Sequence, residues 1–321
     1  MKKDFISIHD LTSGDIKDIF LLTDKIKSKP ENFKSELEGK TLALIFQKPS
    51  NRTRVSFEVG MTQLGGHSIY LGPDDIKLGV REATKDVAAV LSRYVDGIVA
   101  RTFSHKDIIE LALNSGVPVI NGLSDLLHPC QAMADVYTIR EKIASAAGGS
   151  ASPAEGGQGG KKVKLAFVGD GNNVLHSLLH CCAKVGLDVS VATPKGYEPR
   201  KEIVKEAESE AAKSVSRITF SNNPKEAVKD ADVIYTDVWT SMGQEKEREK
   251  RIKAFEGFQV NKGLISLAKK SCLVMHCLPA HRGEEITDDV LDGPNSIVID
   301  EAENRLHVQK AILLKLLRGD K

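Results

Sequence analysis

Short apolar runs alternate with amphipathic stretches through the first part of the chain. The runs are four to six residues long, like buried strands of a parallel sheet, and they lie at 41–46, 67–71, 97–100 and 117–120. Apolar residues at helical spacing occupy the segments around these runs, at 8–26, 55–64, 83–94, 105–114 and 131–143. This alternation is typical of βαβ units, and it predicts an α/β domain with a parallel sheet.

A second series of the same kind follows residue 160. Its apolar runs lie at 163–168, 188–193, 216–220, 232–236, 272–278 and 296–299. Its helical patterns lie at 173–185, 199–213 and 244–254, and a last one covers 303–317. The stretch between the two series, 144–160, is rich in Ala, Gly and Ser and cannot bury apolar area, so it is predicted to be a flexible loop.

We therefore predict two doubly wound parallel-sheet domains linked by helices. The first domain comprises residues 1–143 and the second comprises residues 161–302, with the low-complexity loop 144–160 between them. The C-terminal helix, within 303–321, is expected to return and pack on the first domain. A length of 321 residues suits two domains of this size.

Composition excludes several classes of protein. The chain has 45 basic and 44 acidic residues, a balance that argues against a nucleic-acid partner. Its five cysteines form no CxxC spacing, so neither a disulfide framework nor a zinc ribbon is indicated. No apolar run is long enough to span a membrane, and Asp4, Asp10 and Asp15 interrupt any secretory or transit segment. These features predict a cytoplasmic protein without a membrane partner.

The segment 50–54 has the composition of an anion cradle. It lies between a predicted strand and a predicted helix, and the first turn of a helix offers free N–H groups and a partial positive charge. Ser50, Asn51 and Thr53 add short donors, while Arg52 and Arg54 add guanidinium groups that match phosphate oxygens. An ordinary capped helix start is the alternative interpretation, but two arginines after a strand favour a phosphorylated ligand.

Polar residues also follow the other predicted strands. Ligands of open parallel sheets bind outside the carboxyl ends of the strands, so these positions are candidates for a site. They are Arg101, Thr102, Asn121 and 128–131 in the first domain, and 169–173, Thr236, Asp237, 241–243 and 276–279 in the second. Each has a structural alternative: Arg101 in a surface ion pair, His128 in a loop or core, and Cys277 as a small buried hydrophobe.

Two familiar types of site are disfavoured. Gly169 and Gly171 suggest a dinucleotide fingerprint, but Val174 replaces its third glycine and Thr193 stands where an acidic residue is needed. His276, Cys277 and His281 are possible metal ligands, but no second pair lies at ligand spacing. We therefore expect neither a nicotinamide cofactor nor a metal.

Taken together, these residues resemble the aspartate/ornithine carbamoyltransferase family over essentially the whole chain. The motifs that carry the resemblance are Ser50-Asn-Arg-Thr-Arg54, Ala100-Arg101, Asn121-Gly-Leu-Ser-Asp-Leu-Leu-His-Pro-Cys-Gln131, Gly169-Asp-Gly-Asn-Asn173, Asp237-Val-Trp-Thr-Ser-Met-Gly243, His276-Cys-Leu-Pro279 and Glu303-Asn-Arg305. Within the family, Asp237, 241–243 and 276–279 point to ornithine as the acceptor. One position departs from the pattern, because Asn51 stands where the family usually has threonine.

The resemblance implies transfer of a carbamoyl group from carbamoyl phosphate to the δ-amine of ornithine, with no cofactor. The residues it implies for carbamoyl phosphate are Ser50, Asn51, Arg52, Thr53, Lys77, Arg101, His128, Gln131, Cys277, Leu278 and Arg305. Those it implies for ornithine are Asn173, Asp237, Ser241 and Met242. Arg101, His128 and Cys277 carry the catalytic roles.

The resemblance also implies a homotrimer, or a multiple of trimers, in which Lys77 reaches into the carbamoyl phosphate site of a neighbouring subunit. Two alternatives remain open. One is a carbamoyltransferase for another acceptor, such as aspartate or an acylated ornithine, although Asp237 suits an amine better than an acid. The other is an anion-binding module without catalysis.

Overall fold

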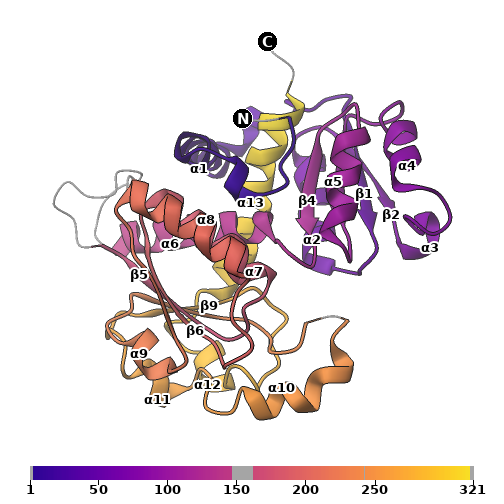
Figure 1. Cartoon of the computed structure of the whole chain (residues 1–321). Helices are drawn as coiled ribbons and strands as arrows, with labels where there is room; N and C mark the ends of the chain where they lie inside the picture. The colour runs from indigo at the N-terminus through magenta and orange to yellow at the C-terminus, as the bar shows by residue number, and fades with distance from the viewer. Residues whose placement is uncertain (1–2, 147–161, 242, 319–321) are drawn as a thin grey trace. The chain divides into compact units, whose positions relative to one another are not determined.

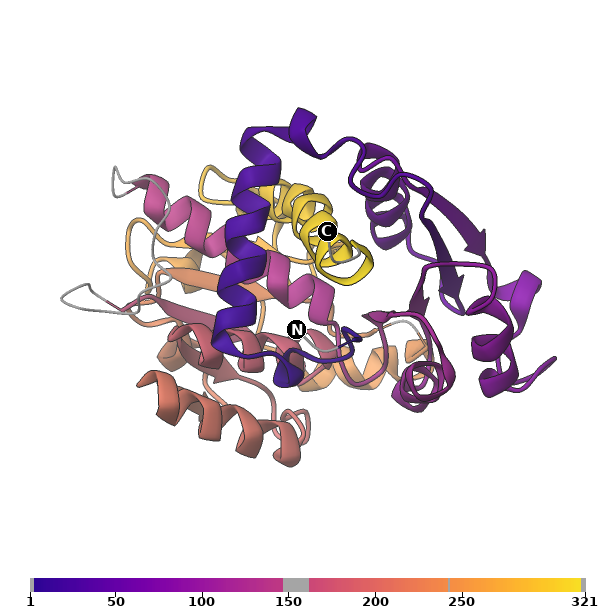
Figure 2. The same ribbon diagram turned by 90° about the horizontal axis from the view of Figure 1, so that it is seen from above.

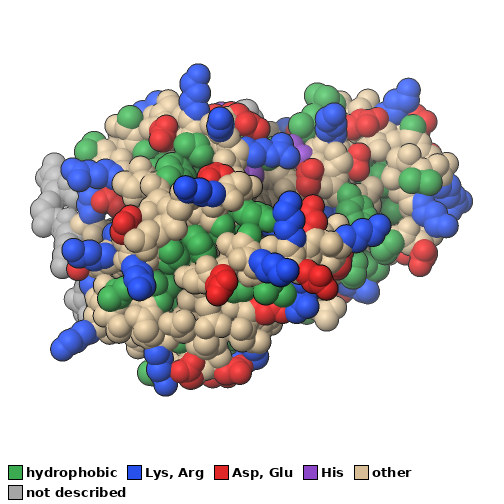
Figure 3. Space-filling view, turned by 60° about the horizontal axis from the view of Figure 1, so that its bottom comes forward, with side chains coloured by type: hydrophobic (Ala, Val, Ile, Leu, Met, Phe, Trp, Pro, Cys, Tyr) green, Lys and Arg blue, Asp and Glu red, His purple; other side chains and the backbone are tan. Residues whose placement is uncertain are grey.

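The computed structural model describes residues 3–146, 162–241 and 243–318. By its internal contacts the chain divides into two compact units, Met1–Tyr137 with Glu303–Lys321, and Thr138–Ala302. None of the helices within the described ranges is both long and apolar enough to cross a membrane. Figure 3 shows basic and acidic side chains interspersed on the face that it presents, as the balanced composition leads one to expect.

The first unit is built on a four-stranded parallel sheet of order β2-β1-β3-β4 (Figure 1). Its strands are β1 (Thr41–Phe46), β2 (His67–Leu71), β3 (Gly97–Arg101) and β4 (Val119–Leu123). The helices between them are α2 (Asn51–Gln63), α3 (Pro73–Ile76), α4 (Thr84–Leu91) and α5 (His105–Asn114). Strands β1, β3 and β4 are almost wholly buried, which explains why apolar residues predominate in their sequences.

Two helices from opposite ends of the chain lie side by side in this unit (Figure 2). They are α1 (Ser13–Ser28), which begins at a Thr12 capping box, and α13 (Val298–Leu317). Lys315 pairs with Asp18 at 2.9 Å, and Lys27 donates to Asn304 at 2.8 Å. These contacts join the start of one helix to the end of the other, so the two run antiparallel. The C-terminal helix thus returns to the first unit, as expected.

The second unit contains a five-stranded parallel sheet of order β7-β6-β5-β8-β9. Its strands are β5 (Lys164–Val168), β6 (Asp188–Ala192), β7 (Ile218–Ser221), β8 (Val233–Thr236) and β9 (Leu273–His276). Its helices are α7 (Asn173–Val185), α8 (Lys201–Ser214), α9 (Pro224–Val228), α10 (Arg248–Ala254), α11 (Lys262–Ile265) and α12 (Asp288–Leu291). Helix α6 (Pro129–Ala146) crosses the boundary between the units.

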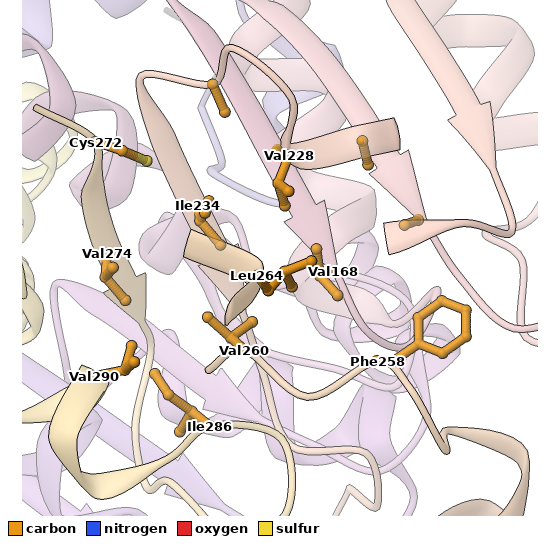
Figure 4. Close-up of a cluster of buried hydrophobic side chains, with 14 of the residues drawn as sticks. Val168, Val228, Ile234, Phe258, Val260, Leu264, Cys272, Val274, Ile286 and Val290 are labelled. Carbon is orange, nitrogen blue, oxygen red and sulfur yellow. The ribbon is translucent and has the colours of Figure 1, made fainter. Parts of the chain in front are cut away.

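A buried apolar cluster fills one side of this second sheet. Figure 4 shows Val168 and Ile234 from neighbouring strands, together with Val260, Leu264 and Ile286 from the segments that cover them. All five are at most 7% exposed. The predicted fold class, two doubly wound parallel-sheet domains, is confirmed.

One predicted strand is wrong. The apolar run at 296–299 makes a single bridge, Val274 to Ser296, and then enters α13 at Val298. Acidic residues in the first turn, Asp300 and Glu301, favour a helix start at this point. Ile299 is 71% exposed, so the run does not supply the two buried faces that an inner strand needs.

Several predicted boundaries also differ. Strand β4 begins at Val119 rather than at 117, because Pro118 has no N–H to pair. Helix α6 continues to Ala146, beyond the expected end at Ile143, so residues 144–146 are helical. The remainder of the predicted loop, 147–160, lies outside the described residues. The short helices α3, α9, α11 and α12 were not predicted, since four or five residues carry too little periodicity.

Candidate functional site

The candidate residues follow the strands at which the strand order of each sheet reverses. In the first unit the chain leaves β1 toward β2 on one side and β3 toward β4 on the other. In the second unit β5 leads to β6 and β7, whereas β8 leads to β9 on the opposite side. Such topological switch points are where open α/β sheets bind ligands. Ser50 and Arg101 belong to the first switch point, and residues 169–173 and Asp237 to the second.

The cradle is the first turn of helix α2, not a loop before it. The helix begins at Asn51 instead of at the predicted Val55, and the Ser50 hydroxyl caps it by accepting from the Thr53 N–H at 3.3 Å. Thr53 is buried and Arg52 half-buried, whereas Asn51 is exposed. Because Arg52 makes no ion pair or hydrogen bond with any described side chain, its guanidinium group is available to an anion.

Arg54, by contrast, is already engaged. Its Nε lies 3.0 Å from the Glu58 carboxylate, one helical turn further on. Its guanidinium carbon lies 3.7 Å from the centre of the Tyr70 ring, which is cation–π geometry. Arg54 therefore has two partners within its own unit, whereas Arg52 has none among the described side chains.

Three arginines act on one buried histidine in this unit. His128 is 6% exposed and precedes α6, and Arg101, at the end of β3, is 5% exposed. Burial and the positive charges of Arg305, Arg101 and Arg52 hold the pKa of His128 well below its usual value of 6.5. The site thus combines three fixed cations with a neutral imidazole, a set suited to a bound phosphate and a developing oxyanion.

Arg305, from helix α13, ties the residues of the site together. Its Nη2 donates to the Thr53 hydroxyl at 3.0 Å, and its Nη1 donates to the Gln131 side-chain oxygen. The Gln131 amide nitrogen in turn donates to Asp135 at 2.7 Å, which fixes which end of the amide faces the arginine. Thr53, Gln131 and Arg305 are each at most 2% exposed, so this network holds the site in one arrangement.

The protonation of His128 can be measured directly. We expect its imidazole to stay neutral between pH 8 and pH 6, because a proton would add a fourth positive charge at a buried position. The unfolded chain takes up that proton near pH 6.5, so this residue lowers the stability of the folded state as the pH falls below that value. NMR of labelled histidine reads the charge, and a midpoint at or above 6.5 would contradict the arginine cluster.

Lys77 lies apart from this network in its own chain. It caps the C-terminal end of the short helix α3 in a left-handed conformation, with a φ of 42°, and it is exposed. Within the described part of the chain its amino group has no ion-pair or hydrogen-bonding partner. It is thus a cation presented to solvent on a turn between 73 and 82.

Asp237 is the centre of the candidate site in the second unit. One of its oxygens accepts from the Cys277 thiol at 3.0 Å and from the Val238 N–H at 2.8 Å. The other accepts from the Asn172 amide at 2.7 Å. A carboxylate that is 5% exposed and holds a thiol against it suits the recognition of an amine.

Asn172 lies within the candidate stretch 169–173, but the sequence assigned it no role in this site. It caps α7 by accepting from the Val174 and Leu175 N–H groups, and its amide nitrogen reaches Asp237. Asn173, the expected ligand, opens the helix and is half-buried. The Asn-Asn pair after Gly171 was the available signal, since an asparagine at a helix start commonly serves as the cap.

Hydrogen bonds around His276 fix the backbone beside Cys277. The His276 Nδ1 accepts from the Leu278 N–H at 2.9 Å, so its Nε2 carries the proton that it donates to Glu285 at 3.0 Å. Leu278 has a φ of 56° and precedes a cis proline, and its carbonyl accepts no hydrogen bond from the described residues. That carbonyl is therefore an acceptor available to a ligand N–H.

Cys277 differs from the other cysteines, which are buried. Burial raises the pKa of the Cys130 and Cys272 thiols to about 12, as expected for small core residues. Cys277 is instead half-buried and bonded to Asp237. Asp237, His276 and Cys277 also place potential metal-ligand atoms within 4.8 Å of one another, but both ring nitrogens of His276 are already hydrogen-bonded.

The segment after Asp237 contributes a further candidate. Ser241 is half-buried, and its N–H donates to the Gln244 side chain at 3.1 Å. Gly243 has a φ of 94°, a backbone conformation that is strained for a residue with a side chain, and this explains the glycine at that position. Met242, the remaining residue expected to bind ornithine, lies outside the described residues.

Comparisons with known proteins agree with both halves of this description. Residues 3–141 match the family model "Aspartate/ornithine carbamoyltransferase, carbamoyl-P binding domain", and residues 161–316 match its "Asp/Orn binding domain". The chain is 55% identical to an ornithine carbamoyltransferase of Pyrococcus horikoshii, with 99% of this chain and 97% of the relative covered. It is 54% identical to an anabolic ornithine carbamoyltransferase of Pyrococcus furiosus, with 99% and 98% covered.

Solved structures give the same result. The ornithine carbamoyltransferase of Pyrococcus furiosus superposes with a TM-score of 0.91 at 53% identity, covering 99% of this chain and 98% of that one. An anabolic ornithine carbamoyltransferase of Campylobacter jejuni superposes with a TM-score of 0.90 at 38% identity, covering 98% and 99%.

Proposed function

Because the chain belongs to the aspartate/ornithine carbamoyltransferase family, we propose that it transfers the carbamoyl group of carbamoyl phosphate to the δ-amine of L-ornithine. The products are L-citrulline and phosphate, a step of arginine biosynthesis. The observation that carries this proposal is the convergence of Arg52, Arg101 and Arg305 on a neutral His128 beside a helix N-terminus. Such a site suits a compact, negatively charged ligand.

Carbamoyl phosphate occupies the first unit in this proposal. Its phosphate lies at the α2 N-terminus, where the N–H groups of the first turn, the Ser50 and Thr53 hydroxyls and Arg52 contact it. The exposed side chain of Asn51 is the weakest of the assigned contacts. The carbamoyl oxygen faces Arg101, Thr53, His128 and Arg305, and its N–H groups face Gln131 and the Leu278 carbonyl.

The reaction is an attack by the δ-amine lone pair on the carbamoyl carbon. The C–N bond forms, negative charge develops on the carbamoyl oxygen, and Arg101, Arg305 and the neutral His128 stabilise it by hydrogen bonding. The C–O bond to phosphate then breaks. The departing phosphate, neutralised by Arg52 and Arg101, takes the proton from the new nitrogen. No covalent enzyme intermediate is required.

Ornithine occupies the second unit, where Asp237 decides between acceptors. A carboxylate attracts the α-ammonium group of ornithine, whereas it would repel the extra carboxylate of aspartate. An acylated ornithine lacks that ammonium charge and leaves Asp237 unpaired. Asn173, Ser241 and Met242 contact the α-amino and α-carboxylate groups. These considerations favour free ornithine.

Phosphate release in the presence of different acceptors tests the function. We expect release from carbamoyl phosphate with ornithine and little with aspartate or N-acetylornithine. Phosphate release with aspartate or N-acetylornithine, but not with ornithine, would show that the enzyme uses that other acceptor. Tight binding of carbamoyl phosphate without phosphate release for any amine would indicate a binding module.

Cys277, ionised to a thiolate, takes one proton from the δ-ammonium group of ornithine and leaves it as the attacking amine, since an alkyl ammonium has a pKa near 10.4 and cannot attack while protonated. We expect Cys277→Ser to lower turnover about tenfold and to shift the pH optimum upward, because a hydroxyl ionises less readily than a thiol. We expect the same two changes in Cys277→Ala. Turnover measured from pH 6 to 10 decides the point, and an unchanged profile in both variants would leave Cys277 a packing role.

Assembly and location complete the proposal. We propose a homotrimer, or a multiple of trimers, in which Lys77 of one subunit completes the carbamoyl phosphate site of the next. Its exposure at a turn, without a partner among the described residues, supports this assignment. We also propose a cytoplasmic location.

A further inference from the structure

A buried ion pair lies beneath the acceptor residues of the second unit. Asp170 lies in the turn after β5, and Arg251 lies on α10. The Asp170 Oδ2 and the Arg251 Nη1 are 3.0 Å apart, and each side chain is 8% exposed. Burial raises the pKa of Asp170 to about 6 although the arginine opposes this, so the carboxylate is costly to bury.

The same guanidinium group also holds the segment that follows Asp237. Arg251 Nη1 donates to the Trp239 carbonyl at 2.9 Å, and its Nε lies 3.2 Å from the Glu247 carboxylate. The Tyr197 ring centre lies 5.0 Å from its guanidinium carbon. Arg251 is therefore held by several neighbours, and it donates one hydrogen bond to the backbone carbonyl of Trp239, which lies between Asp237 and Ser241.

Trp239 strengthens the attachment of this segment to α10. Its indole is 5% exposed and stacks on Phe255, with ring centres 5.5 Å apart and an angle of 28° between the planes. Phe255 is the residue that directly follows α10. Residues 237–240 are thus bound to α10 by one charged hydrogen bond and one aromatic contact.

The turn that carries Asp170 reaches the same segment by a second route, because Asn172 donates to Asp237 at 2.7 Å. Two residues of one turn therefore contact 237–239, one directly and one through Arg251. A buried ion pair is weak evidence for stability, since apolar residues of the same size often serve equally well. What the charged pair adds at this place is a fixed donor for the Trp239 carbonyl.

We propose that Arg251 is a positioning residue for the acceptor site: anchored by Asp170, it holds the Trp239 carbonyl and so keeps Asp237 and Ser241 in register with the turn 169–173. The inference rests on the proposed function for its kinetic consequence, while its structural part stands on the contacts alone. Arg251 touches no acceptor atom in this proposal and acts through the backbone.

The test must separate positioning from stability, because Arg251→Met alone leaves Asp170 buried without its partner and unfolding is then easier. The informative protein is the double variant Arg251→Met with Asp170→Asn, which removes both charges at nearly constant size. Arg248→Met, on the same helix but with a side chain 53% exposed, is the matched control. Arg251→Lys tests how far charge without the planar group restores the effect.

Two readouts report on the segment itself. Trp239 is the sole tryptophan of the chain, so acrylamide quenching of tryptophan fluorescence monitors its burial without any assumption about activity. Initial rates give KM for ornithine and for carbamoyl phosphate separately. We expect the double variant to melt near the wild-type temperature, to be quenched more strongly, and to have an ornithine KM raised about tenfold, as the loss of one charged hydrogen bond implies. KM for carbamoyl phosphate should not change.

Arg251→Lys should fall between the wild type and the double variant, and Arg248→Met should match the wild type. A double variant with wild-type quenching and wild-type ornithine KM would overturn the inference, as would equal changes in both KM values. Wild-type protein that releases no phosphate with ornithine would overturn the proposed function instead, and quenching would still decide whether Arg251 positions the segment.

Discussion

Replacing Arg52 with alanine should weaken carbamoyl phosphate binding by on the order of 10- to 100-fold while the fold stays intact. A charge-assisted hydrogen bond contributes about 1.5–3 kcal/mol, and the Arg52 guanidinium group has no partner within the described residues that would share the loss. Its removal also takes one positive charge from beside His128. Calorimetry with carbamoyl phosphate measures the affinity, and circular dichroism checks the fold.

Arg54→Ala is the matched control, since it removes the same group two positions along the same helix. Arg54 is held by Glu58 and Tyr70, so its loss should leave the affinity within about twofold of wild type. Equal losses of affinity in the two variants would point to a general attraction between the anion and the basic surface. Unchanged affinity in Arg52→Ala would show that the segment 50–54 does not bind carbamoyl phosphate.

Mixing two inactive variants should restore activity if the sites are shared between subunits. Lys77→Ala and Arg101→Ala chains are each expected to be inactive as homotrimers. In a mixed trimer, a site that takes Arg101 from one chain and Lys77 from the next is whole. Random exchange of equal amounts gives such a site in about a quarter of all positions, so about a quarter of wild-type activity should return.

The control for this experiment pairs Arg101→Ala with Arg52→Ala. Both residues belong to one unit of one chain, so every site in the mixture lacks one of them and activity should not rise above that of the two parent variants. Mixed trimers verified by mass spectrometry that remain inactive in the first pairing would place Lys77 outside the site. Activity in the control pairing would show that restoration does not require a shared site.

Much of the fold was predictable because its signals are local. Helix α7 has the bounds expected from periodicity, 173–185, since its residues are apolar at regular spacing between Asn172 and Gly186. The failures come from competing local signals. At 296–299 the composition resembles a strand, but acidic residues in the next turn start a helix, and one bridge to β9 is all that forms.

The candidate site, too, was predictable only in part. Arg52 and Arg54 are equivalent as sequence, but residues two apart on a helix are separated by about 160° around its axis and so lie on nearly opposite faces. Locating the helix start at Asn51 was the missing step. Arg305 was reached by resemblance, and the Asp170–Arg251 pair was not reached at all. Both depend on contacts between segments far apart in the chain, which no local pattern encodes.

The first unit is discontinuous along the chain, and this sets an order of events during synthesis. Its sheet is complete by Leu123, but Arg305, which bonds Thr53 and Gln131, is translated only after the whole second unit. At roughly 5–20 residues per second, the ribosome needs on the order of ten seconds to reach it. Through that interval the nascent chain holds Arg52, Arg101 and His128 without the helix that joins them. The second unit is continuous in sequence, so the hydrogen bonds of Arg305 to Thr53 and Gln131 can form only after that unit has been synthesised.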